Sequence, residues 1–268
     1  MSKLFSDLHQ GPGILLLANA WDAGSARLIE SLGAKAIATT SAGLAWSRGY
    51  PDGNLLPEDK LIDAIGDVAR VIKVPLTVDF EAGFSDDPRI VAKLVARVLA
   101  VGVAGINIED GGGSPDLLCK KITAIREQAV QAGIDLYINA RTDVYLRGIA
   151  TGEAAIEETI RRGSLYRAAG GDGLFVPGLA NIDAIGAITA AIKSMPLNIM
   201  AVPNLPSIDT LQKHGVRRLS AGSAIAQAAL GSAGRHARAF LAGSMSEMFG
   251  GAAEYGEVNK LFASSAHK

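Results

Sequence analysis

Residues 74–84 read V-P-L-T-V-D-F-E-A-G-F, and residues 104–110 read A-G-I-N-I-E-D. Residues 75–80 and 104–108 are short apolar runs bounded by Pro or Gly, a pattern typical of buried parallel strands. Between them, apolar residues recur at helical spacing through the nineties, which predicts a crossover helix. The stretch therefore predicts one βαβ unit, and the remaining chain can be interpreted around it.

Acidic residues follow both of these strands. Asp79 and Glu81 leave the first strand, and Glu109 and Asp110 leave the second. The carboxyl ends of adjacent parallel strands share one edge, where α/β proteins bind ligands. Four carboxylates so close repel one another unless a cation lies among them or some are protonated. Oxygen ligands favour Mg²⁺ or Mn²⁺ over zinc, so a divalent metal site is predicted; helix caps or solvated loop acids are the alternative.

Composition restricts the class of protein. The chain has 268 residues and is 49% hydrophobic, enough for the core of one α/β barrel or of two domains. Its net charge of −1 gives no reason to expect nucleic acid or a membrane as a partner. The single cysteine, Cys119, cannot form an internal disulfide, and no signal-peptide core or membrane-length apolar run occurs. We expect a cytoplasmic protein with one domain, residues 1–268.

Short strands alternate with helices along the chain, which predicts a (β/α)₈ TIM barrel. A doubly wound sheet is the rival fold, but residues 19–22 read N-A-W-D where that fold carries its glycine fingerprint. Residues 224–242 and 245–262 predict more helix than the last barrel unit needs. We expect residues 224–268 to be a helical extension that is swapped onto a neighbouring subunit, with a cover on the same chain as the alternative. The predicted strands are residues 14–18, 36–39, 75–80, 104–108, 137–140, 173–176, 197–201 and 216–219.

Other strand ends should meet at the same mouth of the barrel. Ser41, with the backbone of Ala42 and Gly43, offers N–H donors for a carboxylate or an oxyanion. Arg141 is the basic residue directly at a strand exit, and its planar fork suits a carboxylate, a phosphate or one of the four acids. Residues 220–223, S-A-G-S, either bind phosphate or simply cap the next helix.

Six motifs occur in order along nearly all of the chain: A-N-A-W-D-A-G-S-A (18–26), T-T-S-A-G-L-A (39–45), G-Y-P-D-G (49–53), V-D-F-E-A-G-F (78–84), G-I-N-I-E-D (105–110) and N-A-R-T-D (139–143). Together they resemble the isocitrate lyase/phosphoenolpyruvate mutase superfamily. The resemblance implies a (β/α)₈ barrel that is a homo-oligomer, a tetramer or a dimer, with a swapped C-terminal helix. It also implies a small 2-oxo acid, or a compound cleaved to one, as the substrate.

The resemblance assigns roles to individual residues. Asp79 is implied as the direct Mg²⁺ (or Mn²⁺) ligand, and Glu81 and Glu109 as residues that hold the metal through water. Arg141 is implied to bind or polarise the oxo acid, and Asp52 to lie near the reacting carbon or phosphorus. The metal stabilises the charge that develops when a bond β to the oxo group breaks. Substrate-binding roles are implied for Trp21, Ser41, Ala42 and Gly43.

The sequence departs from the lyases of that superfamily in two places. Those lyases carry a Lys-Lys/Arg-Cys-Gly-His loop whose Cys is a general acid, whereas residues 111–122 read G-G-G-S-P-D-L-L-C-K-K-I. Cys119 is therefore expected to be structural, at the start of a helix predicted over 120–132. The glutamate that such lyases place after the sixth strand is absent from residues 173–178, G-L-F-V-P-G. Isocitrate or methylisocitrate cleavage is not expected.

The expected function is Mg²⁺-dependent cleavage of a C–C bond in a small 2-oxo acid or related dicarboxylate, as in an oxaloacetate decarboxylase or hydrolase. A phosphonopyruvate hydrolase or a mutase-like enzyme acting on a P–C bond is one alternative, and a metabolite-binding barrel without catalysis is another. A Schiff-base aldolase is not favoured, because no predicted strand ends in Lys. If Arg141 does not bind the second anionic group of the substrate, Arg48 and Lys120 are the next candidates.

Overall fold

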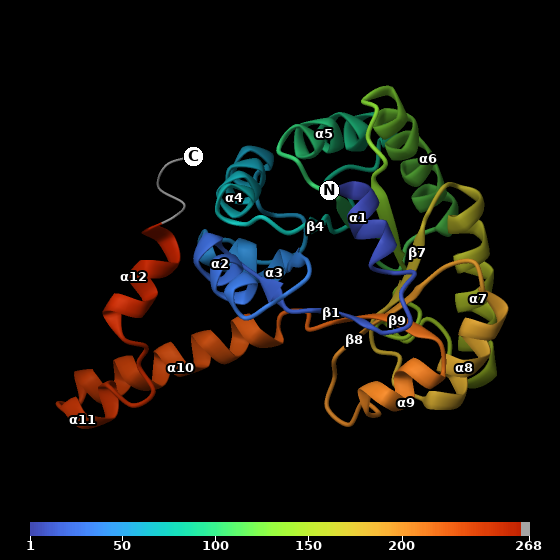
Figure 1. Ribbon diagram of the computed structural model, residues 1–268. Helices are drawn as coiled ribbons and strands as arrows, with labels where there is room; N and C mark the ends of the chain where they lie inside the picture. Colours follow the sequence, from blue (N-terminus) through green and yellow to red (C-terminus); the bar gives the residue numbers. More distant parts are fainter. Residues whose placement is uncertain (264–268) are drawn as a thin grey trace.

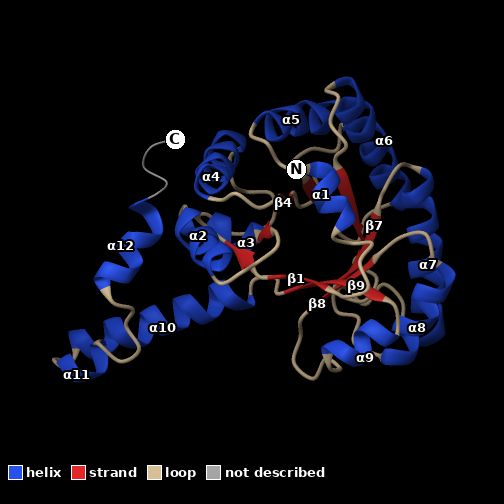
Figure 2. Cartoon of the chain, in the orientation of Figure 1, coloured by secondary structure: helices blue, strands red, loops and turns tan. Residues whose placement is uncertain are grey.

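The computed structural model describes residues 1–263, so residues 264–268 of the expected domain and of its expected C-terminal extension lie outside the described residues. Parallel strands stand at the centre and helices surround them (Figures 1 and 2). The strands of the described chain form one sheet in the order β1-β9-β8-β7-β6-β5-β4-β3-β2, and every neighbouring pair is parallel. This confirms the predicted α/β barrel.

The first predicted strand is divided, and the division closes the barrel. β1 (Leu15–Leu17) pairs with β9 (Val216–Ser220), whereas β2 (Asn19–Ala20) pairs with β3 (Ile37–Thr39). One stretch of chain, interrupted at Ala18, thus joins the last strand to the second barrel strand. The prediction of a single strand over 14–18 was right in place and wrong in extent.

The other strands lie where short apolar runs predicted them, and each predicted end is within one residue of the observed one. Their core positions are fully buried, as Val78, Ile106 and Leu174 illustrate, because helices cover the outside of a parallel sheet. These strands are β4 (Leu76–Asp79), β5 (Gly105–Glu109), β6 (Tyr137–Arg141), β7 (Gly173–Val176) and β8 (Leu197–Met200).

Local caps determine where several helices begin. Asp22 accepts a hydrogen bond from the Ser25 amide at 2.6 Å in a capping box, which determines the start of the second helix. Ser114 caps the sixth helix just before Pro115, so this helix begins five residues earlier than predicted and places Cys119 in its second turn. The helices up to β9 are α1 (Ser2–Asp7), α2 (Ala23–Ser31), α3 (Ser41–Ser47), α4 (Glu58–Val71), α5 (Pro88–Ala100), α6 (Pro115–Gln131), α7 (Gly152–Ala168), α8 (Ile182–Ala191) and α9 (Ile208–Lys213).

The N-terminal end of the barrel is covered by α1, which the sequence analysis did not predict. Phe5 on α1 is fully buried and packs edge-on against the ring of Tyr137 at the start of β6. A Cβ on Gly105 would lie 2.7 Å from the Phe5 ring, so glycine at the start of β5 makes room for this residue. His9 stacks on Tyr137 with ring centroids 4.1 Å apart. The strand starts are thereby sealed by aromatic packing.

The C-terminal segment forms an arm that projects from the barrel (Figure 1). It comprises α10 (Ala224–Leu241), α11 (Met245–Met248) and α12 (Tyr255–Ala263), of which α12 returns to α2, where the Arg27 side chain donates to the Leu261 carbonyl at 2.8 Å. The helix predicted over 245–262 is interrupted because it contains Gly250 and Gly251, the second at a φ of 74°.

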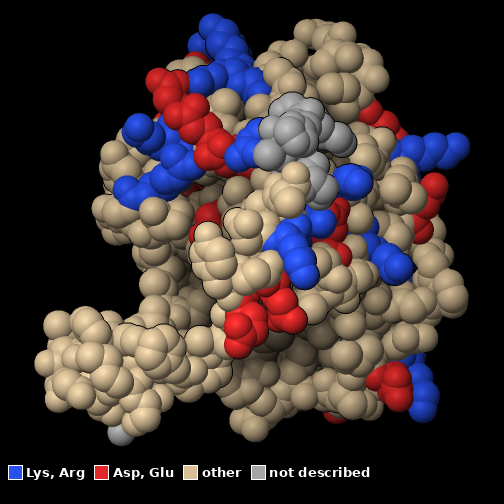
Figure 3. All heavy atoms as spheres, turned by 60° about the vertical axis from the view of Figure 1, so that its left-hand side comes forward, with Lys and Arg blue, Asp and Glu red and all other residues tan. Residues whose placement is uncertain are grey.

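The arm exposes a large apolar surface in the single chain. Leu230, Phe240, Leu241 and Phe249 are each at least half exposed. Among the residues that the structure describes, the lobe that projects at the lower left of Figure 3 shows no charged side chain on that face. Within residues 1–263, no helix combines the length and apolar character needed to cross a lipid bilayer.

Candidate active site

The candidate site lies at the carboxyl ends of three neighbouring strands. Asp79 is the last residue of β4, Glu109 the last of β5 and Arg141 the last of β6. Glu109 and Arg141 are directly opposite one another in the β5–β6 register. The structure therefore brings together the strand-end residues that the sequence analysis selected.

Asp79 links the metal-site candidates to the candidate substrate loop. Its Oδ2 accepts a hydrogen bond from the Ser41 amide at 3.2 Å, and its own amide donates to Thr39 Oγ1 at 2.9 Å. Its Oδ1 is buried and, within the described residues, has no hydrogen-bond partner. A buried acceptor without a partner is costly, so this oxygen indicates a place for a ligand.

Glu81 is held in a strained conformation beside Asp79. Its φ of 49° lies in the left-handed region, which is uncommon for any residue with a Cβ, and such strain is concentrated at functional sites. Its carboxylate accepts from the amide of Asn54, and the residue is 6% exposed. Burial raises the pKa of Glu81 to about 7, although the hydrogen bond from Asn54 lowers it. The charges of Asp52 and Asp79 raise the pKa further.

Arg141 is surrounded by carboxylates. Its Nη1 lies 2.5 Å from Glu109 Oε2, and its Nε and Nη2 donate to the two oxygens of Asp143 at 2.7 and 3.2 Å. Burial raises the pKa of Glu109, against the attraction of Arg141, and the charge of Asp79 raises it further. Although burial opposes it, Glu109 and Asp143 raise the pKa of Arg141, which stays charged. The predicted pairing of Arg141 with one of the four acids is confirmed.

Asp110 does not join the other three acids. Its side chain is fully buried and accepts hydrogen bonds from the Tyr166 hydroxyl at 2.6 Å, Arg162 Nη1 at 2.8 Å and the Asp143 amide at 3.0 Å. Asp110 lies in the wall of the same cavity as Glu109, but these three donors already occupy its carboxylate. The expectation that Asp110 joins the other three carboxylates is thus corrected, because Asp110 instead anchors α7 through Arg162 and Tyr166.

The candidate substrate loop is the first turn of α3. In that turn Ser41, Ala42 and Gly43 have N–H groups without intrahelical acceptors, and Ser41 donates to Asp79. Gly43 packs against Trp21, because a Cβ at this position would lie 2.6 Å from the Trp21 Cβ. Trp21 therefore supports the loop from behind, and only glycine fits at residue 43.

The segment over residues 49–54 lies beside Glu81. Asp52 is exposed, and its charge contributes to the raised pKa of Glu81. Asn54, which the sequence analysis missed, donates its amide to Glu81 and accepts at its side chain from the Phe84 amide at 3.2 Å. Its positive φ of 60°, which Asn tolerates better than most residues, makes both contacts possible; a Gly-Asn pair after a turn was the one signal in the sequence.

A cavity of about 420 Å³ opens beside Glu109. Two cations that the sequence analysis missed line it. Lys121 is buried and donates to the Ala82 carbonyl at 2.9 Å, and Arg147 donates to Asp143 at 3.1 Å while remaining half exposed. Of the two expected reserve cations, Arg48 instead pairs with Asp67 at 3.3 Å, and Lys120 is not part of the cavity wall.

The carboxylates fit a hard divalent cation in charge and donor type. Asp79, Glu81 and Glu109 supply oxygen alone, and their repulsion and the unpartnered Asp79 Oδ1 both favour a cation among them. Across residues 1–263, however, no three acidic, His or Cys side chains are close enough in this conformation to hold a metal together. The three acids therefore fit Mg²⁺ by their chemistry and not yet by their spacing.

The surroundings of Cys119 and of residues 220–223 favour structural roles for both. Burial, and then the charge of Asp116, raise the pKa of the Cys119 thiol, which is the opposite of what a reactive cysteine needs. In the segment over 220–223, the Gly222 amide donates to Asn19 Oδ1 at 3.0 Å and the Ala221 amide to the Leu17 carbonyl at 3.0 Å. These contacts favour a structural junction over a phosphate site.

Comparisons with known proteins identify sequences and structures similar to this chain. The family model described as phosphoenolpyruvate phosphomutase matches residues 5–241. Rv1998c of Mycobacterium tuberculosis (strain ATCC 25618 / H37Rv), an uncharacterized protein, is 37% identical over 240 residues, 88% of each chain. Oxaloacetate decarboxylase 2 of Pseudomonas fluorescens (strain Pf0-1) is 26% identical over 230 residues, 84% of this chain and 79% of its own. A crystal structure from Burkholderia cenocepacia J2315 is 34% identical with a TM-score of 0.89, over 98% of this chain and 95% of that one.

Proposed function

Because this chain belongs to the phosphoenolpyruvate mutase/isocitrate lyase superfamily, we propose that it is a Mg²⁺-dependent lyase that cleaves a C–C bond in a small 2-oxo dicarboxylate such as oxaloacetate. The observation that carries the proposal is the unpartnered Oδ1 of Asp79, beside Glu81, Glu109 and the N–H groups of α3. The similarity to an oxaloacetate decarboxylase supports this choice of substrate class.

Asp79 would hold Mg²⁺ directly, and Glu81 and Glu109 would hold it through water. When bound, the metal supplies a Lewis acid that stabilises negative charge on the oxo oxygen as the β bond breaks. Glu81 and Glu109 have raised pKa values, so the site attracts a cation more strongly as these groups lose their protons.

The chain's own groups would orient the substrate. Two N–H groups of the α3 turn, those of Ala42 and Gly43, would receive one carboxylate, as the first turn of a helix favours anions. Arg141 would polarise the oxo acid, and its fork is held in place by Glu109 and Asp143. Asp52, on the exposed rim, would approach the reacting carbon.

The test is turnover of a panel of 2-oxo acids with and without Mg²⁺, on the wild type and on Asp79→Ala. We expect Asp79→Ala to lose Mg²⁺-dependent activity and to keep its circular dichroism spectrum. Asp63→Ala, a change at an exposed acid on α4, is the matched control and should behave as the wild type. Wild-type turnover by Asp79→Ala in Mg²⁺ would refute the proposed metal site.

A second candidate, cleavage or rearrangement of a P–C bond, is favoured by the match to the phosphoenolpyruvate phosphomutase family. Phosphonopyruvate in the same panel distinguishes the two, because turnover of it above that of oxaloacetate would favour the P–C reaction. Metal-dependent binding of 2-oxo acids without turnover would instead indicate a binding barrel.

We also propose that the chain is a homo-oligomer in which the arm covers a neighbouring subunit. An apolar groove of about 680 Å³ lies at the root of the arm, and exposed Leu16, Leu28 and Leu32 line it. Phe240→Glu on the arm should lower the mass measured by light scattering, because a charge would be buried in the contact. Val130→Glu, at an exposed apolar residue of α6, is the control.

A further inference from the structure

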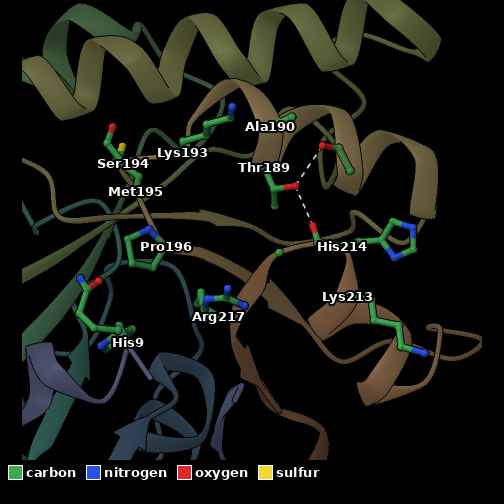
Figure 4. Close-up of a pocket in the computed structure, with 13 residues that line it drawn as sticks. His9, Thr189, Ala190, Lys193, Ser194, Met195, Pro196, Lys213, His214 and Arg217 are labelled. Atoms are coloured by element: carbon green, nitrogen blue, oxygen red, sulfur yellow. Dashed lines mark hydrogen bonds between the residues drawn. The ribbon is translucent and has the colours of Figure 1, made fainter. Parts of the chain in front are cut away.

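A second, larger cavity of about 710 Å³ lies at the opposite end of the barrel (Figure 4). Its wall is formed by the end of α8 and the residues leading into β8, by the end of α9 and the residues leading into β9, and by His9 and Gln10 after α1. All of these precede strands, so the cavity opens on the N-terminal face. In α/β barrels catalysis occurs on the other face.

The cavity wall is strongly basic. Lys193, Lys213 and Arg217 contribute to it, and no acidic residue does. Within the part of the chain that the structure describes, none of these three side chains is in an ion pair, and Arg217 donates only to the carbonyl of Val216, at 3.3 Å. The two lysines are exposed and lie on different sides of Arg217, with their amino groups turned away from it (Figure 4). The chain as a whole has a net charge of −1, so this excess of positive charge is local.

A fourth positive charge lies directly behind the wall. Arg218, next to Arg217 on β9, is 1% exposed; its Nη2 donates to Asn107 at 3.0 Å, while its Nε and Nη1 have no partner among the described residues. Burial lowers the pKa of Arg218 to about 10, so it remains charged at neutral pH. His9 is neutral there, because burial and then Arg218 lower its pKa to about 3. No carboxylate is among the residues that line the cavity, so an anion that enters it is attracted by Lys193, Lys213 and Arg217 together.

We propose that this cavity binds a small organic phosphate, with the phosphate group among Lys193, Lys213 and Arg217. Lysine and arginine are the side chains that recognise phosphate. The volume exceeds what one inorganic ion fills and lies in the range of small-molecule pockets. Met195 and Pro196 provide an apolar wall for the organic part, and Ser194 provides a hydroxyl group, whereas the Thr189 hydroxyl already donates to the His214 carbonyl at 2.7 Å. This site is independent of the proposed lyase reaction.

Calorimetric titration with phenyl phosphate and with inorganic phosphate tests the proposal. The titrations are made at pH 8 in EDTA, with ionic strength matched by KCl. We expect phenyl phosphate to bind, and to bind more tightly than inorganic phosphate. The combined variant Lys193→Gln, Lys213→Gln and Arg217→Gln should weaken its binding roughly tenfold or more, a change of about 1.4 kcal/mol. The matched control replaces three exposed lysines elsewhere by Gln: Lys60, Lys73 and Lys93.

Each outcome decides between this cavity and other sites. Binding that survives in Asp79→Ala supports the N-terminal cavity, whereas binding lost in that variant places the anion at the candidate active site and overturns the proposal. Absence of binding, equal affinity for both probes, or an equal loss in the control variant also overturns it. If the combined variant does not fold, Lys193→Gln and Lys213→Gln are measured singly, and each should weaken binding about twofold to threefold; unchanged affinity in both contradicts the proposal.

Discussion

Replacing Asp110 by alanine should destabilise the fold and leave metal binding intact. The change removes the acceptor for the Tyr166 hydroxyl at 2.6 Å, Arg162 Nη1 at 2.8 Å and the Asp143 amide at 3.0 Å. The side chains of Asp110 and Arg162 are 0% and 7% exposed, so a buried guanidinium loses one of its two carboxylates. Breaking a buried pair typically costs about 3–5 kcal/mol. Because Glu158 remains beside Arg162, we expect the low end, about 3 kcal/mol.

Urea unfolding followed by circular dichroism measures this cost. The midpoint should fall in Asp110→Ala while the slope with urea stays the same, since a similar surface unfolds. Glu127→Ala, at an exposed acid on α6, is the control and should change stability by less than about 0.5 kcal/mol. Mn²⁺ affinity is measured in parallel. A loss of stability under about 1 kcal/mol would contradict the buried-pair argument. A loss of Mn²⁺ affinity as large as in Asp79→Ala would show that Asp110 belongs to the metal site.

Arg141→Lys keeps the charge but not the two-pronged contact, so kcat/KM on the best 2-oxo acid should fall by roughly 10²-fold, about 2.7 kcal/mol; wild-type kinetics would mean that Arg141 serves only its acid partners. Cys119→Ser should keep most of the activity, because Cys119 lies in the second turn of α6 and is not part of the wall of the cavity beside Glu109, and a loss of about 10³-fold would instead identify a general acid. His9 has a pKa of about 3 in the fold against 6.5 when unfolded, so the unfolded chain binds more protons below pH 6.5. The stability due to neutral His9 is therefore complete above pH 6.5 and is lost as the pH falls toward 3. Between pH 7 and pH 5 wild-type stability should fall by about 2 kcal/mol more than that of His9→Leu, measured by urea unfolding at each pH; equal losses in both proteins would contradict this.

Most of the barrel could be predicted because its strands are short apolar runs with turn residues on both sides. The elements that were missed are short. α1 has six residues, and α3 has seven in a stretch that reads as a strand exit. The break at Ala18 depends on pairing with both β9 and β3, which are far apart in sequence and become neighbours only when the barrel closes. Local patterns carry no information about such closure.

The candidate site could be predicted where its charged residues lie directly at the ends of strands. Asp79, Glu109 and Arg141 are strand-end residues, and the barrel fold alone brings them together. Asp110 was misplaced because its partners on α7 are more than fifty residues away along the chain. Lys121 was not predicted because it lies on a helix, where a lysine is ordinarily exposed to solvent.

The Ser41 amide donates a hydrogen bond to Asp79, so Asp79 and a bound anion would compete for this donor. This N–H can serve either the aspartate or an incoming carboxylate, and an anion that takes it releases Oδ2 of Asp79. Under the proposed function, substrate and Mg²⁺ would then each increase the affinity for the other, and by the same factor, because linkage is reciprocal. An anion bound at the α3 turn without being turned over would tighten metal binding rather than displace the metal. The resting state would therefore be one in which neither ligand is held strongly alone.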